Sequence, residues 1–515
     1  MTRRLLRGGV VHTPAHPQAT ALAVDHDTVV WVGDEAGAER FAGDATQTVE
    51  LAGAFVAPAF VDSHVHLAAT GLAAAGVRLH GVRHRTQALD LVAAAARSRP
   101  PVLRGGGWDE TLWDDPRPLT RMELDTAAAG LPVYLARVDV HSAVVSSALA
   151  DRSPGITSCA GWTADGRVER DAHHAARKGA DSLTTPSMRA DAIAAALAEA
   201  GAQGIGCVHE IGAPHLSQHE DFATIAAIAE REPVPLVLGY WGELGAYDAA
   251  RELGVLGLAG DLCVDGSIGS HTSALRLPYA DRATTGHAYL SAEQLREHLI
   301  GCTRRGLQAG FHVIGDRAND LVRAALQAAA HEVGRDAMRA AGHRLEHVEM
   351  PDPAVVAVLA DLGVHASVQP AFDAAWGGPD GLYAQRLGVE RAVAMNPLRS
   401  MLAAGVGLAF GSDSPVTSLA PWHGVRAAAQ HRTAGQRLTL QEAFSAHTAG
   451  GWAAAGRTGA GTLVAGAAAT YAVWEIGGDV GAYRLPRVEA ALPRCLSTVV
   501  GGRTIFATPH FEQED

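Results

Sequence analysis

Two histidines in the run from Val61 to His66 are spaced for metal binding. His64 and His66 lie two residues apart in an apolar, strand-like stretch, and side chains at i and i+2 of a strand point to the same side. If this strand lines a barrel, both imidazoles enter its lumen at the carboxyl end, where they can share a metal. With 25 histidines in 515 residues, about one His-x-His pair is expected by chance, so the pair alone is a weak indication.

Three further candidate ligands, His312, His347 and Asp413, each end an apolar, strand-like run. Taken singly, a histidine at a strand end is more often a hydrogen-bonded structural residue, and Asp before Ser-Pro is a common turn former. Together with His64 and His66 they supply four neutral nitrogens and a carboxylate, which is the ligand set of Zn²⁺ or a similar divalent ion. Such an ion lowers the pKa of its water towards ~7, and Asp413 could take the water's proton and pass it to a leaving group.

The composition is typical of a soluble, globular protein. The chain is 48% hydrophobic and 19% charged, and its formal net charge of −13 argues against a general nucleic-acid binder. Its five cysteines are scattered without a C-x-x-C pair, which favours a reducing compartment. We find no signal peptide and no apolar run near the ~18 residues that span a bilayer, so we expect a cytoplasmic protein. The expected partner is a small-molecule substrate, with no nucleic acid and no membrane, and a homodimer is left open.

The sequence pattern changes twice along the chain. Both ends read as short strands separated by turns, and we infer that they pair into one small β-sandwich. Between them, apolar runs alternate with Ala-rich helical stretches, which predicts a parallel sheet covered by helices. We expect a composite β-sandwich from residues 1–56 and 456–515 and an α/β barrel over 57–455. The predicted helices are Arg189–Ala200, Glu293–Arg304, Asn319–Glu332 and Pro353–Leu362. The candidate strands are 58–66, 102–106, 132–138, 204–210, 234–240, 261–265, 308–313, 343–347, 364–369 and 406–412.

These strands number more than eight, so a closed eight-strand barrel must leave a couple of them as insertions. The sequence does not say which ones. Active sites of such barrels lie at the carboxyl ends of the strands, and the polar residues of these runs fall there.

Several motifs resemble the amidohydrolase superfamily, and within it the amidohydrolase-3 branch that includes N-substituted formamide deformylases. The matching pieces span nearly the whole chain and occur in family order. They are 57–67 (APAFVDSHVHL), 107–113 (GWDETLW), 140–143 (VHSA), 265–270 (DGSIGS), 312–318 (HVIGDRA), 344–347 (RLEH), 411–416 (GSDSPV), 440–444 (LQEAF) and 447–450 (HTAG).

The resemblance implies a distorted (β/α)₈ TIM barrel with a composite β-sandwich and metal-dependent hydrolysis. It also implies particular strands for the ligands. His64 and His66 would lie on strand 1, His312 on strand 5, His347 on strand 6 and Asp413 on strand 8.

Two positions depart from the family pattern. Family members often carry a carboxylated lysine that bridges two metals, and Asp261 stands there; the family's arginine after Gly-Ser is His271. Lys178 is the only lysine, and it lies in a polar stretch far from that motif. We therefore expect a site without carboxylated lysine. It holds one tight Zn²⁺, which we favour, or two ions bridged by Asp261 or, as a second choice, by Glu210.

Strand alternation places further residues around this site. If 261–265 is a strand, Asp261, Cys263 and Asp265 share one face. Because His347 enters the lumen, Glu346 should face away from it and be structural. The pair His209–Glu210 is expected to fill a layer of the barrel. Around the metal we also place Arg344.

Five other residues are candidates for contacts with the substrate. His141 could polarise a carbonyl group or hold a developing oxyanion, with a hydrogen bond behind the ligands as its alternative role. We expect Trp108, Trp113, His271 and Trp376 to contact substrate. For Trp108 and Trp113, capping of the barrel is the alternative.

We conclude from the sequence that the chain is a metal-dependent hydrolase of C–N bonds, in an amide or N-substituted formamide, with Asp413 as general base and acid. The alternatives are hydrolysis of C–O bonds in esters or lactones at the same site, and a non-catalytic amidohydrolase-like scaffold. A scaffold has no need to keep the five ligand candidates together.

Overall fold

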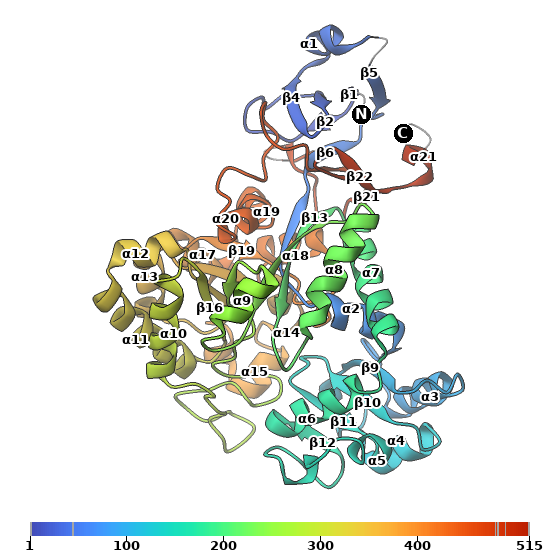
Figure 1. The fold of residues 1–515 in the computed structure, drawn as a ribbon, viewed down its shortest axis with the longest axis vertical. Helices are drawn as coiled ribbons and strands as arrows, with labels where there is room; N and C mark the ends of the chain where they lie inside the picture. Colours follow the sequence, from blue (N-terminus) through green and yellow to red (C-terminus); the bar gives the residue numbers. More distant parts are fainter. Residues whose placement is uncertain (1–2, 44–45, 479, 482–483, 490, 513–515) are drawn as a thin grey trace.

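The computed structural model describes residues 3–512, apart from 44–45, 479, 482–483 and 490. Figure 1 shows three layers along the long axis of the molecule. Strands from both chain ends lie at the top, a helix-covered barrel occupies the middle, and a separate sheet lies below it. The predicted α/β class is confirmed.

Eight parallel strands form one continuous sheet that curves into a barrel. Its two outer strands meet where the backbone N–H of Asp413 donates to the carbonyl of His64 (2.8 Å) and that of His66 donates to Ser414 (3.1 Å). The predicted eight-strand barrel is therefore confirmed. In sheet order the strands are β7 (Phe60–Val65), β13 (Ile205–Gly212), β14 (Leu236–Trp241), β15 (Gly257–Leu258), β16 (Gln308–Val313), β17 (Arg344–His347), β18 (His365–Val368) and β19 (Leu408–Phe410).

Helices alternate with these strands and cover the barrel (Figure 1). Their buried faces and the outward faces of the strands form the largest apolar core of the molecule. The helices are α2 (Leu67–Ala75), α7 (Pro186–Ala202), α8 (His219–Arg231), α9 (Tyr247–Leu253), α10 (Ala292–Thr303), α11 (Asp316–Val333), α12 (Arg335–Ala341), α13 (Pro353–Leu362), α14 (Pro370–Trp376), α15 (Leu382–Leu387), α16 (Val389–Ala392), α17 (Leu398–Ala403), α18 (Pro421–Ala429), α19 (Leu440–Ala446) and α20 (Ala449–Ala454).

Local sequence signals fix the ends of these helices, as α13 illustrates. The Asp352 side chain accepts hydrogen bonds from the backbone N–H groups of Ala354 (3.0 Å) and Val355 (2.9 Å), and Pro353 occupies the first helical position. Gly363 ends the helix with φ 64°, a left-handed conformation that glycine adopts without steric cost. All four predicted helices are present, with ends shifted by three residues or fewer.

An inserted sheet separates the first barrel strand from the second. It contains the predicted strands 102–106 and 132–138, so these two are the insertions that the sequence left undetermined. Its strands are β8 (Val77–Arg78), β9 (Leu103–Trp108), β10 (Val133–Arg137), β11 (Ser142–Val145) and β12 (Arg167–Glu169), and its helices are α3 (Arg85–Ala96), α4 (Arg121–Ala127), α5 (Ser147–Ala150) and α6 (Arg170–Asp181).

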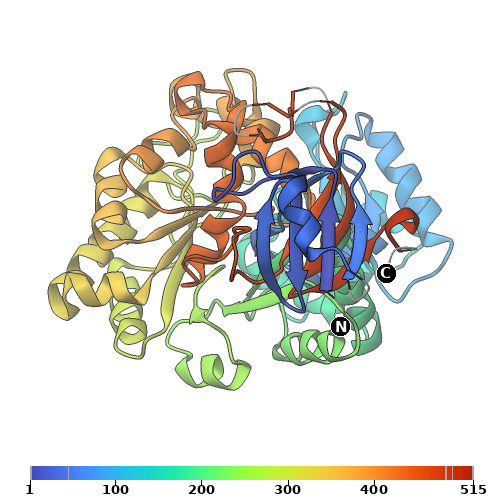
Figure 2. The ribbon, with the colours of Figure 1, turned by 90° about the horizontal axis from the view of Figure 1, so that it is seen from above.

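Strands from the two chain ends form two further sheets and lie side by side in Figure 2. One sheet is N-terminal only, and the other contains strands from both ends. Antiparallel pairing of β6 with β20 places Pro58 opposite Tyr471. Leu6, Val24, Val56 and Tyr471 belong to one apolar core between these sheets. One sheet holds β1 (Arg3–Arg7), β3 (Ala21–Asp25), β4 (Thr28–Gly33) and β5 (Thr46–Glu50); the other holds β2 (Val10–Val11), β6 (Phe55–Pro58), β20 (Tyr471–Glu475), β21 (Arg494–Val500) and β22 (Arg503–Ala507). The domain boundaries at 56 and 456 stay predictions.

The expected strand at 261–265 is wrong. The fourth barrel strand, β15, ends at Leu258, and residues 261–265 form an irregular segment with a single bridge between Cys263 and His312. Asp265 accepts backbone hydrogen bonds from Ile314 (3.0 Å) and Gly315 (2.8 Å), so it fastens this segment to the loop after β16. The segment can therefore bring Asp261 into the barrel mouth without strand alternation.

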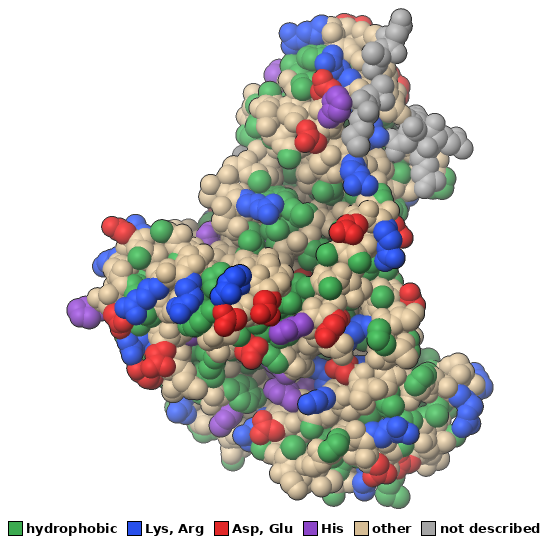
Figure 3. Space-filling view, in the orientation of Figure 1, with side chains coloured by type: hydrophobic (Ala, Val, Ile, Leu, Met, Phe, Trp, Pro, Cys, Tyr) green, Lys and Arg blue, Asp and Glu red, His purple; other side chains and the backbone are tan. Residues whose placement is uncertain are grey.

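The surface carries mixed charges. On the face drawn in Figure 3, acidic and basic side chains are interspersed and no extended area of one sign is seen. Within the described residues, no helix combines the length and the apolar character that a membrane crossing requires.

Candidate metal centre

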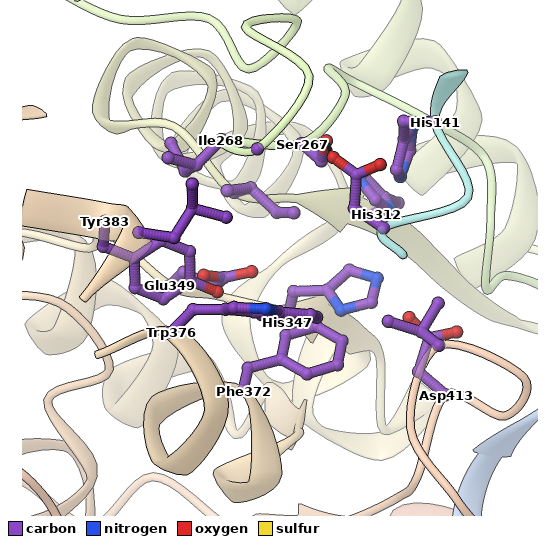
Figure 4. Close-up of a pocket in the computed structure, with 15 residues that line it drawn as sticks. His141, Ser267, Ile268, His312, His347, Glu349, Phe372, Trp376, Tyr383 and Asp413 are labelled. Atoms are coloured by element: carbon purple, nitrogen blue, oxygen red, sulfur yellow. Dashed lines mark hydrogen bonds between the residues drawn. The ribbon is translucent and has the colours of Figure 1, made fainter. Parts of the chain in front are cut away.

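The five predicted ligands and Asp261 come together at the carboxyl end of the barrel. Each follows or ends a barrel strand, as parallel strands require of residues that share one site. The five predicted ligands are buried and the Asp261 side chain is 13% exposed, and Figure 4 shows His312, His347 and Asp413 around one pocket. The set comprises His64, His66, Asp261, His312, His347 and Asp413.

One group of ligands forms around His64 and His66. Their Nε2 atoms lie 3.3 and 3.2 Å from Asp413 Oδ1. Two ligands that bind one ion at about 2.1 Å with tetrahedral angles are about 3.4 Å apart, so these separations fit a shared ion.

The other ring nitrogens of these two histidines are held from behind. His64 Nδ1 lies 2.9 Å from Glu346 Oε2, and His66 Nδ1 lies 2.8 Å from the carbonyl oxygen of Ile211. Both partners are hydrogen-bond acceptors, so both Nδ1 atoms carry hydrogen and both Nε2 atoms present lone pairs to the centre.

Asp261 connects this group to a second one. Its Oδ1 lies 3.5 Å from His64 Nε2, and its Oδ2 lies 3.4 Å from His66 Nε2. The same Oδ1 lies 3.6 Å from His312 Nδ1 and 4.0 Å from His347 Nε2. The carboxylate therefore stands between two overlapping sets of ligand atoms, although its side chain is shorter than that of a carboxylated lysine.

Unpaired atoms inside the cluster fit a bound cation. His64 Nε2 and Asp261 Oδ1 are buried and have no hydrogen-bond partner. Burial of a carboxylate and an imidazole lone pair without partners is costly, whereas a divalent ion would satisfy both. The donor set of imidazoles and carboxylates suits zinc and its neighbours in the transition series.

The carboxylates of the cluster are held in the ionised form. Burial alone would raise the pKa of Asp413, but the close approach of the His64 and His66 imidazoles outweighs this effect and lowers that pKa well below its usual range. For Asp261 burial is likewise outweighed by His312 and His64, and its pKa is lowered. Burial and the neighbouring His312 lower the pKa of His347 to about 3, so its imidazole is neutral and able to bind metal at pH 7.

Glu346 does not face away from the lumen, so that expectation is wrong. It is fully buried, contacts His64, and accepts a hydrogen bond from Arg344 Nε (2.7 Å). The alternation rule fails because His347 has φ 71°, which turns its side chain towards the site while Glu346 and Arg344 share the lumen side. Burial raises the pKa of Glu346, but Arg344 and His64 bring it down to about 2, so the carboxylate that orients His64 is charged.

The layer below the metal cluster is filled as expected at His209. Its Nδ1 lies 2.9 Å from Arg344 Nη1, inside the barrel. Glu210 accepts a hydrogen bond from the backbone N–H of Leu67 (2.8 Å). This places Glu210 beside the cluster rather than between the two ligand groups.

His141 comes to the site from the inserted sheet, just after β10. Its ring centroid lies 5.1 Å from that of His312, and it lines the same pocket (Figure 4). Burial and His312 lower the pKa of His141 to about 4. The side chain is therefore a neutral imidazole beside the metal cluster, as a hydrogen-bond donor to a carbonyl group would have to be.

The four predicted substrate contacts do not all lie in the pocket. Trp376 lines the pocket beside the cluster. Trp108 and Trp113 instead pack in the core of the inserted sheet, where Trp108 Nε1 donates to the carbonyl of Leu135 (2.9 Å). His271 Nε2 lies 2.9 Å from Asp281, and its ring packs edge-on against Tyr279 outside that pocket. Only Trp376 of the four thus has the surroundings that a substrate contact needs.

Lys178 lies on the exposed face of α6, in the inserted part of the chain. It cannot bridge the ligand groups, in agreement with the expectation of a site without carboxylated lysine.

A charge network joins the roof of the pocket, which we define as residues 137–141 and 267–269, to the rest of the protein. Arg137 is fully buried and lies 2.9 Å from Glu110 and 3.1 Å from Asp139. Glu110 also lies 3.1 Å from Arg386 on α15. Asp139 accepts hydrogen bonds from Ser267 and Ser270. The inserted sheet, the segment after Asp265 and α15 are therefore held together over the cluster.

Sequence reasoning missed part of the pocket wall. Glu349, Phe372, Tyr383 and Asp139 line it but were not singled out. For two of them a signal existed, because Glu349 follows the predicted ligand His347 by two residues and Asp139 precedes His141 by two. Phe372 and Tyr383 come from short helices whose place over the pocket no local pattern encodes.

The chain is similar over most of its length to known proteins. LONG AFTER FAR-RED 3 from Arabidopsis thaliana is 29% identical over 459 residues, which cover 82% of this chain and 77% of that protein. N-substituted formamide deformylase from Arthrobacter pascens is 23% identical over 472 residues, 84% of each chain. A solved structure described as an uncharacterized metal-dependent hydrolase from Pyrococcus furiosus is 26% identical, with a TM-score of 0.71 over 92% of this chain and 98% of that one.

The family match has the same extent. The model of the amidohydrolase family matches residues 47–506, which include every ligand candidate and the strands β6, β20 and β21 of the chain ends. The resemblance found in the sequence motifs is thereby confirmed, and the chain belongs to the amidohydrolase family.

Proposed function

We propose that the protein is a metal-dependent hydrolase that cleaves the C–N bond of an amide or N-substituted formamide. The observation that carries this proposal is the buried cluster in which His64 Nε2 and Asp261 Oδ1 lack partners while facing Asp413 and the other ligands. The similarity to an N-substituted formamide deformylase supports a C–N bond as the target.

The cluster would hold Zn²⁺ in two unequal places. His64, His66, Asp413 and Asp261 offer four ligand atoms for one tight ion. His312 and His347 share Asp261 with that group and offer a second, weaker place. A divalent ion bound there would acidify a water molecule and polarise the carbonyl group of the substrate.

Asp413 would act as the proton carrier. Its carboxylate is ionised and lines the pocket, so it can accept a proton from the attacking water. The oxygen of that water bonds to the carbonyl carbon, and the carbon–nitrogen bond breaks as Asp413 returns the proton to the leaving nitrogen. The remaining proton of the new carboxyl group passes to the amine, so the products are a carboxylate, which is formate for a formamide, and a protonated amine.

His141 would stabilise the charge that develops on the carbonyl oxygen. Its neutral ring carries one N–H group and lies on the pocket wall near His312. Donation of a hydrogen bond to an oxygen that becomes negative favours the transition state over the ground state.

Metal analysis combined with an activity panel tests the proposal. We expect purified protein to retain a divalent metal, to hydrolyse at least one member of a panel of N-formyl and N-acetyl amines, and to lose that activity on chelation. Esters of the same acids serve as a control for C–O cleavage. Hydrolysis by metal-free protein, or protein that binds no divalent metal, would contradict the proposal.

A further inference from the structure

The pocket beside the metal cluster has a second, chemically different wall. On one side are Asp413 and His141; on the other, Figure 4 shows Glu349, Trp376 and Tyr383. The mechanism proposed above uses the first side only. The second side combines a carboxyl group with aromatic rings.

Glu349 is a buried acid with an unused oxygen. Its side chain is 3% exposed, its Oε2 has no hydrogen-bond partner, and its carboxyl group interacts with the Tyr383 hydroxyl. Its backbone is fixed by the hydrogen bond from Asn396 N–H to its carbonyl (2.7 Å). A carboxyl oxygen held in this way and left without a partner calls for a donor from outside the protein.

The residues that line the pocket supply no cation to Glu349. Asp139 is balanced by Arg137 at 3.1 Å, and Asp413 faces the histidines of the metal cluster. Among the lining residues there is no arginine and no lysine. A substrate carboxylate would therefore find no arginine or lysine on this side, whereas a protonated amino group could donate a hydrogen bond to the unpartnered Oε2 of Glu349.

Aromatic rings complete the wall. Phe372, Trp376 and Tyr383 are nearly buried, with ring centroids 5.0 Å apart for Phe372 and Trp376 and 6.2 Å apart for Trp376 and Tyr383. The faces of such rings attract cations, most strongly where water is excluded.

We propose that Glu349, Trp376 and Tyr383 form a subsite for a protonated amino group, so that the amide cleaved at this site belongs to a compound that also carries an ammonium group. The statement about the amide rests on the proposed function; the ammonium subsite itself does not. Small amines suit it, because the cavity is only about 30 Å³ in volume and the apolar lining residues Ile268, Leu382 and Val416 can cover a very short alkyl group.

Ligand binding without chemistry tests the subsite. Dissociation constants of ethylammonium and ethanol, which differ mainly in charge, would be measured by ligand-observed NMR on the full-length, metal-loaded protein at pH 7. We expect the ammonium ion to bind about tenfold more tightly than the alcohol. No detectable binding of the ammonium ion, or equal binding of the two, would overturn the proposal.

A set of variants separates the subsite from other causes. Glu349→Gln keeps the shape and should reduce the preference to about twofold or less, while Tyr383→Phe should reduce it in part. Glu390→Gln removes the same charge from the exposed surface of α16 and should leave the preference unchanged. A preference that survives Glu349→Gln would mean coordination of the amine to metal, which also overturns the proposal. If circular dichroism shows Glu349→Gln to be unfolded, Trp376→Leu replaces it with the same expected loss.

These experiments distinguish failure of the subsite proposal from failure of the proposed function. Metal-dependent hydrolysis without ammonium preference would retain the function and reject the subsite. Ammonium preference that depends on Glu349, in a protein without hydrolytic activity, would retain the subsite and reject the function.

Discussion

The floor and the roof of the pocket are built in different ways. The floor consists of the carboxyl ends of β7, β16, β17 and β19, which belong to one barrel. Its residues His64 and His66 are fixed by buried hydrogen-bond partners. The roof comes from an inserted sheet and from residues 267–269, and ion pairs around Arg137 join it to α15. The residues of the floor can thus catalyse the same reaction while the sequence of the roof and of its neighbouring helices changes. We infer that reactivity resides in the floor and selectivity in the roof and the aromatic wall.

Removal of a floor ligand should have the largest effect. For Asp413→Ala and His64→Ala we expect kcat on a confirmed substrate to fall by about 10³-fold or more, because proton transfer and metal binding are lost together. The fold should persist, since these side chains line a site and do not fill the apolar core. Steady-state kinetics and circular dichroism provide the measurements. Turnover near that of the parent would show that the floor is assigned to the wrong residues.

Loss of the charge behind His64 should have the next largest effect. Glu346→Gln should weaken metal affinity by about 10–100-fold, because the carboxylate fixes the tautomer of His64 and raises the basicity of its Nε2. Competition with a chelator of known affinity measures this change. Glu210→Gln is the matched control, since it alters a buried carboxyl that bonds a backbone N–H and no metal-facing histidine. If both changes weakened metal affinity equally, Glu346 would have no special role in orienting His64.

A change in the roof network should separate stability and catalysis from metal binding. Arg386→Met removes the link to Glu110 and Asp281, and we expect the free energy of unfolding to fall by about 2–3 kcal/mol, less than for a fully buried pair because Asp281 is partly exposed. The value of kcat/KM should fall as His141 and Asp139 lose their fixed position. Metal affinity should stay unchanged; a parallel loss of metal would mean that floor and roof are not independent.

The smallest effect is expected at the tryptophans. Trp108→Phe should lower the free energy of unfolding by about 1–2 kcal/mol, through the lost hydrogen bond to Leu135 and the smaller ring, and leave KM unchanged. Trp376→Phe should raise KM with little loss of stability. Denaturant titration and kinetics on both variants test this contrast. A higher KM in Trp108→Phe would instead indicate that the inserted sheet contacts the substrate directly.

The sequence predicted the floor well because its signals are local. A histidine or aspartate at the end of an apolar run indicates that the run is a strand and that the polar side chain lies at the carboxyl end of that strand. Five such residues came together as expected. Asp261 was also expected near the ligands because it occupies the family's lysine position, and it lies in the cluster. The added argument from strand alternation was wrong, since its segment is not a strand. Its role as a bridge stays a prediction.

The remaining errors have physical causes that a pattern cannot report. Glu346 was misplaced because one backbone angle at His347 breaks the period of two. The tryptophans of the 107–113 motif were assigned to the pocket, although a sheet inserted between the first two barrel strands buries them in a core of its own. Glu349, Phe372 and Tyr383 meet only through tertiary packing.

The pairing of β6 with β20 has a consequence for synthesis on the ribosome. Pro58 pairs with Tyr471, so the partner of an early strand is made roughly 400 residues later. At 5–20 residues per second, translation leaves that strand edge waiting for roughly 20–80 s. Residues 60–66, which follow it directly, also wait for Asp413 and Ser414 before the barrel can close. An unpaired edge of this kind is open to association with other chains during that time, so we expect folding in the cell to depend on chaperones that shield the nascent N-terminal strands.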